Sequence, residues 1–488
     1  MNVRQGTVGI ERALWMCALP AALALTGCKV GPNYVAPDTP TPQTWHSRLQ
    51  DGLVRGEADP NVLASWWTTL DDSVLSGLIE RAVAGNLDLK QARARVREAR
   101  AQRWAARGEL FPMLDATGSA TWSRSGGKGI PTVSTETYAS NFDAAWELDL
   151  FGGIRRSVEA AQASLEASEE DWRNTLVSLL AETALNYVDV RTYQARLAAA
   201  QASLKTQNET YQLTVWRSQA GLGDELAVQQ ARYNLESTRS QIPSLQTGLE
   251  EAMNRVAVLL GEPLGQVHAE LEQPQPIPVP PAEVAVGIPA DIVRRRPDIR
   301  QAERRLAAQT ARIGVATAEL YPKLVLNGSV GLETLSLSHP SASGTWVLNG
   351  GPSVSLPLFN ATIRPNIEVQ SALQEQALFQ YESTVLSALE EVENALAAYA
   401  QEQQRRDNLR EATAAAEAAV ALAQSEYQTG VADFTTVLDA ERSLLSFQDQ
   451  LNQSNGTVTS NVIRLYKALG GGWRPMASAA APKIAGGL

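Results

Sequence analysis

The fold is decided by a short interruption, Tyr427-Gln428-Thr429-Gly430-Val431-Ala432-Asp433. It divides the stretch from Pro365 to Arg474, which has no internal proline and otherwise predicts helix. Before the interruption, apolar residues recur at alternating steps of four and three, the pattern of a helix packed along a neighbour. These are Val385, Leu389, Val392, Leu396 and Tyr399. After the interruption, Leu444, Leu451, Val458 and Leu465 repeat every seven residues. The pattern predicts a helical hairpin with Gly430 at its tip and a first arm on the order of 100 Å long.

The same pattern occurs earlier in the chain, which predicts a duplication. Four short motifs recur in the same order at an offset of about 209 residues. The pairs are Phe111-Pro112 with Tyr321-Pro322, Leu148-Asp149-Leu150-Phe151 with Leu356-Pro357-Leu358-Phe359, Gly221-Leu222 with Gly430-Val431, and Leu260-Gly261 with Leu469-Gly470. Solenoid repeats have periods of only about 20 to 50 residues. The offset therefore indicates two copies of one large motif.

The start of the chain predicts a lipoprotein signal. Arg4 and Arg12 precede an apolar run, Ala13–Leu25, that is too short to cross a bilayer as a helix. The run ends in Leu25-Thr26-Gly27-Cys28, which resembles the bacterial lipobox, so we expect Cys28 to carry diacylglycerol and an N-acyl group. The alternative is an ordinary signal peptide with an incidental cysteine. Lys29, rather than Asp, follows the cysteine, and by resemblance to the lipoprotein sorting pattern this favours the outer membrane.

The chain divides into six segments. They are a signal peptide at 1–27, a lipidated extended segment at 28–60, a first repeat at 61–261, a proline-rich linker at 262–296, a second repeat at 297–470 and a tail at 471–488. Each repeat holds a strand hairpin and a helical hairpin. These fall at 113–150 and 154–260 in the first repeat, and at 323–358 and 362–469 in the second. We also expect each returning helix to be interrupted, near Pro243–Gly248 and Asn452–Gly456.

Four stretches alternate apolar and polar residues and predict strands. They lie at 113–122, 138–148, 324–332 and 346–356. Each is about ten residues, enough for a tilted strand to cross the hydrocarbon layer. A soluble sandwich hairpin is the alternative. Because four strands cannot close a barrel and open strand edges are not tolerated in lipid, the membrane interpretation predicts a barrel shared between chains.

The sequence gives little support to an enzyme or a nucleic-acid-binding protein. The histidines at 46, 268 and 339 are scattered, and no Cys/His ligand spacing or phosphate loop occurs. The formal net charge of -11 opposes nucleic-acid binding, so we interpret the arginines of 82–109 as a solvated helix face. Gln194, Gln201 and Asn208 lie on the seam of the helix at 154–220. They either face a hydrated interior or set register as buried polar residues.

Several motifs resemble the TolC family of outer-membrane efflux channels, in its OprM/NodT lipoprotein branch. They are Cys28–Tyr34, Trp146–Arg155, Arg295–Ile299 and Tyr427–Asp439. The resemblance implies a mainly α fold with membrane β-strands, in which coiled-coil helical hairpins accompany four strands per chain that close a 12-stranded barrel in a homotrimer. It also implies a channel that exports small toxic molecules or drugs, extending from the outer membrane into the periplasm.

The resemblance further implies two protein partners, a periplasmic adaptor and an inner-membrane pump of the resistance-nodulation-division type. No cofactor is expected beyond the covalent lipid on Cys28. An outlet for type I secretion and a non-conducting lipoprotein that bridges the periplasm are the alternatives.

The family closes its tunnel at the helix tips, which points to candidate gate residues. Asp439 matches the inner aspartate of the constriction and Tyr427 the tyrosine of the outer gate link, and we place Thr435 with them. The partners of that tyrosine fall at Ala227 and Ala432, so the link is not preserved in its family form.

Two further groups of residues near the tips are candidates. Asp224 or Glu225 is a candidate substitute partner for Tyr427. The residues that match the adaptor-contacting tips are Gly221, Leu222, Gly430 and Val431. The alternative for the glycines is that they only permit the turn.

Overall fold

A computed structural model describes residues 29–38, 40–50, 52–56, 59–334 and 344–473. The predicted signal peptide, Cys28, most of the loop expected at 336–344 and the tail beyond Trp473 lie outside them. The chain separates into two compact units. Among the described residues, the first comprises 29–38, 95–169 and 301–382, and the second comprises those within 40–94, 170–300 and 383–473. Each unit therefore takes residues from both predicted repeats.

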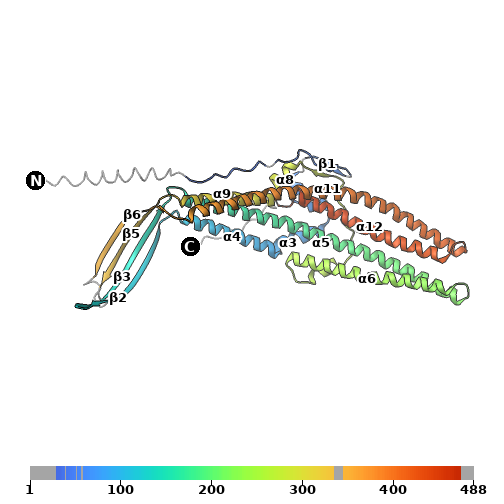
Figure 1. Cartoon of the computed structure of the whole chain (residues 1–488). Coiled ribbons are helices and arrows are strands. Elements are labelled where there is room, and N and C mark those ends of the chain that lie inside the picture. Colours follow the sequence, from blue (N-terminus) through green and yellow to red (C-terminus); the bar gives the residue numbers. More distant parts are fainter. Residues whose placement is uncertain (1–28, 39, 51, 57–58, 335–343, 474–488) are drawn as a thin grey trace. The chain divides into compact units, whose positions relative to one another are not determined.

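The first unit contains an antiparallel sheet of four strands in the order β2-β3-β5-β6 (Figure 1). The strands are β2 (Met113–Gly127), β3 (Ile130–Leu148), β5 (Lys323–Thr334) and β6 (Thr345–Ser355). β3 pairs with β5 from Tyr138 opposite Thr334 to Leu148 opposite Leu324. The two predicted hairpins are thus joined edge to edge. In the described chain, β2 and β6 each keep one edge without a strand partner.

Large apolar side chains of the sheet are exposed in the single chain. They include Leu114, Trp122, Phe142, Leu332 and Trp346. An open sheet with uncovered apolar side chains is not stable by itself in water. The sheet therefore requires an apolar surrounding or further strands.

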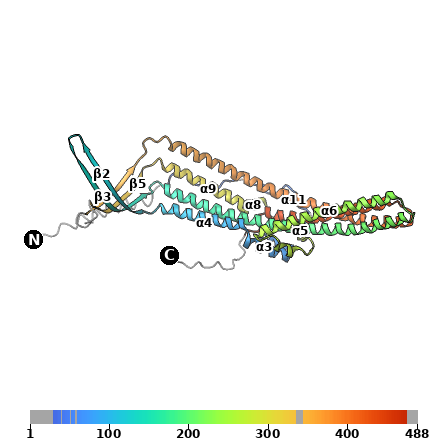
Figure 2. The same ribbon diagram turned by 90° about the horizontal axis from the view of Figure 1, so that it is seen from below.

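The helices are dominated by two hairpins of unequal arms (Figure 2). α5 (Gly153–Gln219) and α11 (Ile363–Thr429) have 67 residues each, and their partners are α6 (Glu225–Leu260) and α12 (Phe434–Ala468). α4 (Leu87–Gly108) leads into β2, and α9 (Pro297–Ala318) leads into β5. The long helices predicted from the apolar seams are therefore present in both copies.

None of the helices that the structure describes carries an apolar stretch long enough to cross a membrane.

The predicted interruptions of the returning helices are wrong. α6 continues through Pro243, and α12 continues through Gly456. The glycines that suggested breaks are instead sites of close helix approach: a Cβ on Gly248 would lie 2.5 Å from the Tyr193 ring of α5, and one on Gly456 would lie 2.1 Å from Thr192 Oγ1. The smallest side chain lets α6 and α12 pack on adjacent residues of α5.

In the main apolar core of the second unit, short elements surround the long helices. The short elements are α2 (Pro60–Ala64), a 3₁₀ turn (Trp66–Leu70), α3 (Ser73–Gly85), α7 (Gln266–Leu271) and α8 (Pro289–Arg295), with β1 (Leu53–Arg55) parallel to β4 (Val284–Val286). Trp66 is fully buried and its ring stacks on Tyr466 with centroids 5.7 Å apart. The predicted surface linker is only partly exposed: residues 272–276 are exposed, whereas Pro278 is buried and its carbonyl accepts from Thr459 Oγ1 at 2.7 Å.

The three polar residues on the α5 seam differ in the structure. Gln194 is buried, donates to the Leu271 carbonyl at 2.6 Å and accepts from Arg191 at 2.8 Å. Gln201 and Asn208 are exposed in the single chain. Gln194 therefore fixes the packing of α5 against the linker.

Candidate functional site

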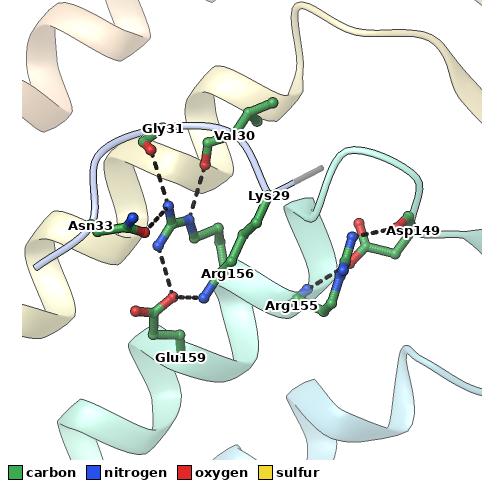
Figure 3. Close-up of polar contacts among 8 residues, drawn as sticks. All are labelled: Lys29, Val30, Gly31, Asn33, Asp149, Arg155, Arg156 and Glu159. Carbon is green, nitrogen blue, oxygen red and sulfur yellow. Dashed lines mark hydrogen bonds and ion pairs between the residues drawn. The ribbon is translucent and has the colours of Figure 1, made fainter. Parts of the chain in front are cut away.

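The first six described residues are bound against α5 (Figure 3). The Arg156 side chain is fully buried and donates to the carbonyl oxygens of Val30 at 2.9 Å and Gly31 at 3.0 Å, and to Asn33 Oδ1 at 2.9 Å. The Val30 amide donates to the Phe151 carbonyl at 3.1 Å. We call this arrangement of residues 29–34 on α5 and α9 the N-terminal dock.

The charge of Arg156 is compensated inside the dock. Its guanidinium bonds Glu159 at 2.9 Å, and Lys29 forms an ion pair with the same carboxylate. Burial alone would raise the pKa of Glu159, but the hydrogen bonds from Lys29 and Arg156 outweigh it and hold the pKa below its usual value. A buried guanidinium requires such partners, since an unpaired charge is costly in a low dielectric.

Three glycines make room for the dock. Gly31 has φ of 82°, and a Cβ there would lie 2.5 Å from the Cα of Gly314 in α9. A Cβ on Gly314 would in turn lie 2.7 Å from the Arg156 side chain, and one on Gly152 would lie 3.0 Å from the Cα of Lys29. A larger residue at Gly31 or Gly152 would meet backbone atoms across the contact, and one at Gly314 would meet the Arg156 side chain.

The dock brings together two motifs that sequence reasoning treated separately. Lys29–Tyr34 of the first motif supplies the bound segment, and the second motif, Trp146–Arg155, ends one residue before the arginine that binds it. Arg155 has a different role, because its amide and its Nε donate to Asp149 at 2.8 and 3.1 Å (Figure 3). Nothing in the sequence indicates which of the two adjacent arginines, Arg155 or Arg156, is buried.

Tyr34 closes the far end of the dock. Its hydroxyl donates to Glu303 at 2.9 Å, and the guanidinium of Arg304 lies 5.4 Å from its ring centroid. Both partners belong to α9. The whole segment from Lys29 to Tyr34 is thereby fixed to the helices of the first unit.

The tip of each helical hairpin is a glycine in the left-handed conformation. Gly221 has φ of 72° and Gly430 has φ of 77°, and the next amides, Leu222 and Val431, each donate 2.8 Å bonds five residues back. These are Schellman caps, in which glycine avoids the steric cost of a Cβ. Leu222 and Val431 are 72% and 77% exposed. The tips thus present uncovered apolar side chains.

The predicted gate residues lie near the tips but do not form one cluster. Asp439 and Thr435 are exposed on α12, and Asp439 is 3.3 Å from the Arg442 guanidinium one turn on. The ring of Tyr427 packs on Phe434, with centroids 5.3 Å apart. It also lies 4.6 Å below the guanidinium of Arg217.

Neither acidic residue suggested as a partner of Tyr427 takes that role. Asp224 caps α6 by accepting from the Leu226 amide at 3.2 Å, and Glu225 accepts from Gln229 at 2.8 Å. Arg217 takes the position instead, through a cation–π contact between α5 and α11. Ala227 fits because it joins the apolar cluster of Ala231, Phe434 and Leu438 against which Tyr427 packs.

Arg442 makes a second link between the two hairpins. It donates to Asn234 Oδ1 at 2.9 Å and to the Tyr233 hydroxyl, both on α6, and its guanidinium lies 5.0 Å from the Tyr233 ring centroid. Sequence reasoning missed both arginines. The three-residue spacing from Asp439 was a readable signal for Arg442. Arg217 had none, because its partner is far along the chain.

A polar cavity of about 550 Å³ lies between α5, α6 and α12 beside this link. Arg442, Asn234 and Tyr233 line it, together with an ion pair in which Arg196 bonds both carboxylate oxygens of Asp449 at 2.7 and 3.0 Å. The two hairpins are thus joined here by polar contacts across a cavity.

Comparison of the sequence with known proteins identifies the family. The sequence profile described as "Outer membrane efflux protein" matches residues 78–262 and 288–471. The chain belongs to this outer membrane efflux protein family. The two matched segments agree with the predicted duplication of the chain.

The relatives match this chain over most of their length. Nodulation protein T of Rhizobium leguminosarum bv. trifolii is 35% identical over 94% of this chain and 97% of its own. The antibiotic efflux pump outer membrane protein ArpC of Pseudomonas putida is 32% identical over 93% and 94%. The solved outer-membrane channel OprN is 38% identical with a TM-score of 0.85, covering 92% of this chain and all of that one.

These likenesses confirm the expected fold class. The protein is a mainly helical outer-membrane efflux protein that extends into the periplasm, and its relatives are efflux and channel proteins rather than enzymes.

Proposed function

We propose that three copies of this chain form the outer-membrane channel of a tripartite efflux pump of the resistance-nodulation-division type, exporting small toxic molecules or drugs. The observation that carries this proposal is the four-stranded sheet with one free edge on β2 and another on β6. Three copies joined edge to edge give twelve strands with no edge left open, which lipid demands. The name of ArpC as an antibiotic efflux pump component supports the assignment of cargo.

The two edges of the first unit suit a head-to-tail ring. α4 leads into β2, and α11 follows β6, so each free strand edge continues into an edge helix. Val369, Leu373 and Phe379 are exposed on α11, and Trp104 is exposed on α4. When one surface of a chain binds a different surface of the next copy, the assembly closes into a ring if the rotation allows it. We assign α4 with β2 of one copy, and the part of α11 up to Glu382 with β6 of the next, to this interface.

The lipid and the dock attach the N-terminal segment in this proposal, beside the shared sheet that anchors the protein. Cys28 carries the covalent lipid, and the dock holds the following residues on the helices that lead into and out of the strands. The fixed position of Lys29, at an ion pair with Glu159, supports this role.

The helix tips form the periplasmic end of the channel. We assign Asp439, Tyr427 and Thr435 to the gate, and Gly221, Leu222, Gly430 and Val431 to contact with the adaptor protein that joins the channel to the inner-membrane pump. The exposed apolar side chains of Leu222 and Val431 support the second assignment, since exposed apolar patches mark binding surfaces.

Light scattering with detergent correction tests the assembly. The full precursor has a mass of 52.6 kDa, so three mature chains have a protein mass of about 150 kDa. A stable monomer in detergent would contradict the shared barrel. Trp104→Ala and Phe379→Ala should each raise the fraction of monomer, whereas Leu386→Ala, an exposed apolar residue on the part of α11 in the second unit, serves as a control for general solubility effects.

A further inference from the structure

A buried carboxyl group joins the two helical hairpins near their tips. Glu441 of α12 is only 5% exposed. Its Oε1 accepts hydrogen bonds from Thr210 Oγ1 of α5 at 3.1 Å and from Gln424 Nε2 of α11 at 3.5 Å. Its Oε2 is buried and has no donor among the residues that the structure describes. The acid therefore sits where helices of both hairpins meet.

The groups that face Glu441 are uncharged. Thr210 approaches from α5 and Gln424 from α11, and neither ionises. On α12 itself, Asp439 is 74% exposed, and Arg442 is turned toward α6. Burial raises the pKa of Glu441, and the hydrogen bonds from Thr210 and Gln424 oppose this only in part. A carboxylate in such a site is disfavoured, because no cation compensates its desolvation.

Three ionisable groups on the neighbouring helices, Arg217, Tyr211 and Tyr233, make contacts of their own. Arg217 of α5 lies over the ring of Tyr427 on α11, and Tyr211 packs in the same apolar cluster. From α6, Tyr233 accepts from Arg442. None of these three contacts involves Glu441.

We propose that Glu441 is a proton-binding site whose occupancy holds the two hairpins together. The carboxyl group is protonated while α12 packs against α5 through Thr210. When the hairpins separate, water reaches the carboxyl group, which ionises and releases its proton to the solvent. Each chain thus releases one proton on separation and takes one up on closing. The inference rests on the proposed function in one respect, namely that separation of the hairpins is the movement that opens the tunnel.

The direction of the pH dependence follows from the two environments. In the packed state the pKa is raised, and in the separated state it returns toward the usual value of 4.5. Below that value the acid is protonated in both states, so the packing is then tightest. As the pH rises through the raised pKa, the packing weakens by at most about tenfold per pH unit for each chain, since one proton is linked to the movement.

Distance measurements between the tips test the proposal in the purified full-length protein. Spin labels on Leu222→Cys and Val431→Cys report the separation of the hairpins by pulsed dipolar spectroscopy, because both side chains are exposed and the sequence holds only two cysteines, at 17 and 28. We expect the label distance to lengthen as the pH rises from the usual carboxyl pKa of 4.5 through the raised pKa of Glu441.

Three variants sharpen the test. Glu441→Gln copies the neutral acid and should keep the short distance across the whole range. Asp439→Asn removes an exposed acid two residues away and should behave like the parent protein. Thr210→Val removes a hydrogen bond that lowers the pKa of Glu441, so the transition should move to higher pH.

Two results would overturn the proposal. One is a parent protein whose label distance does not change with pH, and the other is Glu441→Gln changing with pH as the parent does. Because Thr210→Val retains the acid, a transition that stays at the parent's pH in that variant would also contradict it, even if Glu441→Gln fails to fold. These distances are measured without ion flow, so a channel that does not conduct would contradict the proposed function and not the proton site.

Discussion

Arg156 donates a hydrogen bond to the carbonyl oxygen of Gly31 at 3.0 Å, from a guanidinium without solvent exposure. The two residues are 125 positions apart in the chain. Any residue at position 31 would offer Arg156 a backbone carbonyl. Glycine is nevertheless required there, because a Cβ would collide with the Cα of Gly314. The relationship fixes the N-terminal segment to the helices that lead into and out of the sheet.

Loss of this arginine should release the N-terminal segment. Arg156→Met leaves the Val30 and Gly31 carbonyls without their buried donor, which should lower stability by about 2–4 kcal/mol. We expect faster tryptic cleavage after Lys29 and a lower urea midpoint. Arg155→Met is the matched control, because Arg155 bonds Asp149 and not the segment. Equal protection of Lys29 in both variants would show that the dock does not depend on Arg156.

The dock should weaken in acid. The pKa of Glu159 is held below its usual value, mainly by Lys29 and Arg156 acting against burial. Its contribution to stability is therefore present above the usual carboxyl pKa and is lost as the pH falls through the lowered one. Hydrogen exchange of residues 29–34, corrected for the intrinsic pH dependence, should rise over that window. Glu159→Gln should exchange faster at neutral pH and show a flatter profile, and a profile as steep as the parent's would refute the assignment.

Removing the proposed lipid should leave the assembly intact. In Cys28→Ser we expect no incorporation of radioactive palmitate but an unchanged mass in detergent, because the shared sheet rather than one acylated residue anchors the protein. Undiminished labelling of the variant would contradict the lipobox interpretation.

The charge near the gate should be set by Asp439 together with Arg442. In a trimer, three Asp439 carboxylates should favour cations, and Arg442 at 3.3 Å should offset part of that charge. Asp439→Ala should weaken cation selectivity and divalent block, while Arg442→Gln should strengthen both. Reversal potentials in a salt gradient measure the two effects. Unchanged selectivity in Asp439→Ala would place the constriction elsewhere.

The ring of Tyr427 should matter more than its hydroxyl. Arg217 lies over the ring face, so Tyr427→Phe keeps the contact and should change conductance little. Tyr427→Ala and Arg217→Gln remove it and should each raise the open probability several-fold, for a loss of about 1 kcal/mol. If Tyr427→Phe opens the channel as much as Tyr427→Ala does, a hydrogen bond from the hydroxyl holds the link.

The fold was predictable wherever one signal persists over many residues. The seams of α5 and α11 repeat over long stretches, and the strand alternation is regular, so both hairpin types could be placed. Gly248 and Gly456 were wrongly interpreted as helix breaks. The sequence alone does not distinguish a glycine that permits close helix packing from one that ends a helix. The tip glycines were correctly placed, since their turns are local.

The sites were less predictable because their partners are distant. Arg156 binds backbone carbonyls, which leave no trace in the side-chain sequence. Arg217 and Tyr427 meet only after both hairpins have formed, and Glu441 looks like one of many exposed helix acids until α5 and α11 cover it. Only the spacing of Asp439 and Arg442 was local enough to suggest a pair.

Single-channel recording in planar bilayers tests the central claim, a pore made of three copies, most directly. The trimer fraction from detergent should give discrete cation-selective steps of low conductance, and Arg217→Gln should open more often under the same conditions. Protection of the strands from protease shows whether the trimer fraction has inserted into the bilayer. If an inserted trimer gives no conductance steps, even with Arg217→Gln, the claim is contradicted. That result would favour a non-conducting lipoprotein that bridges the periplasm.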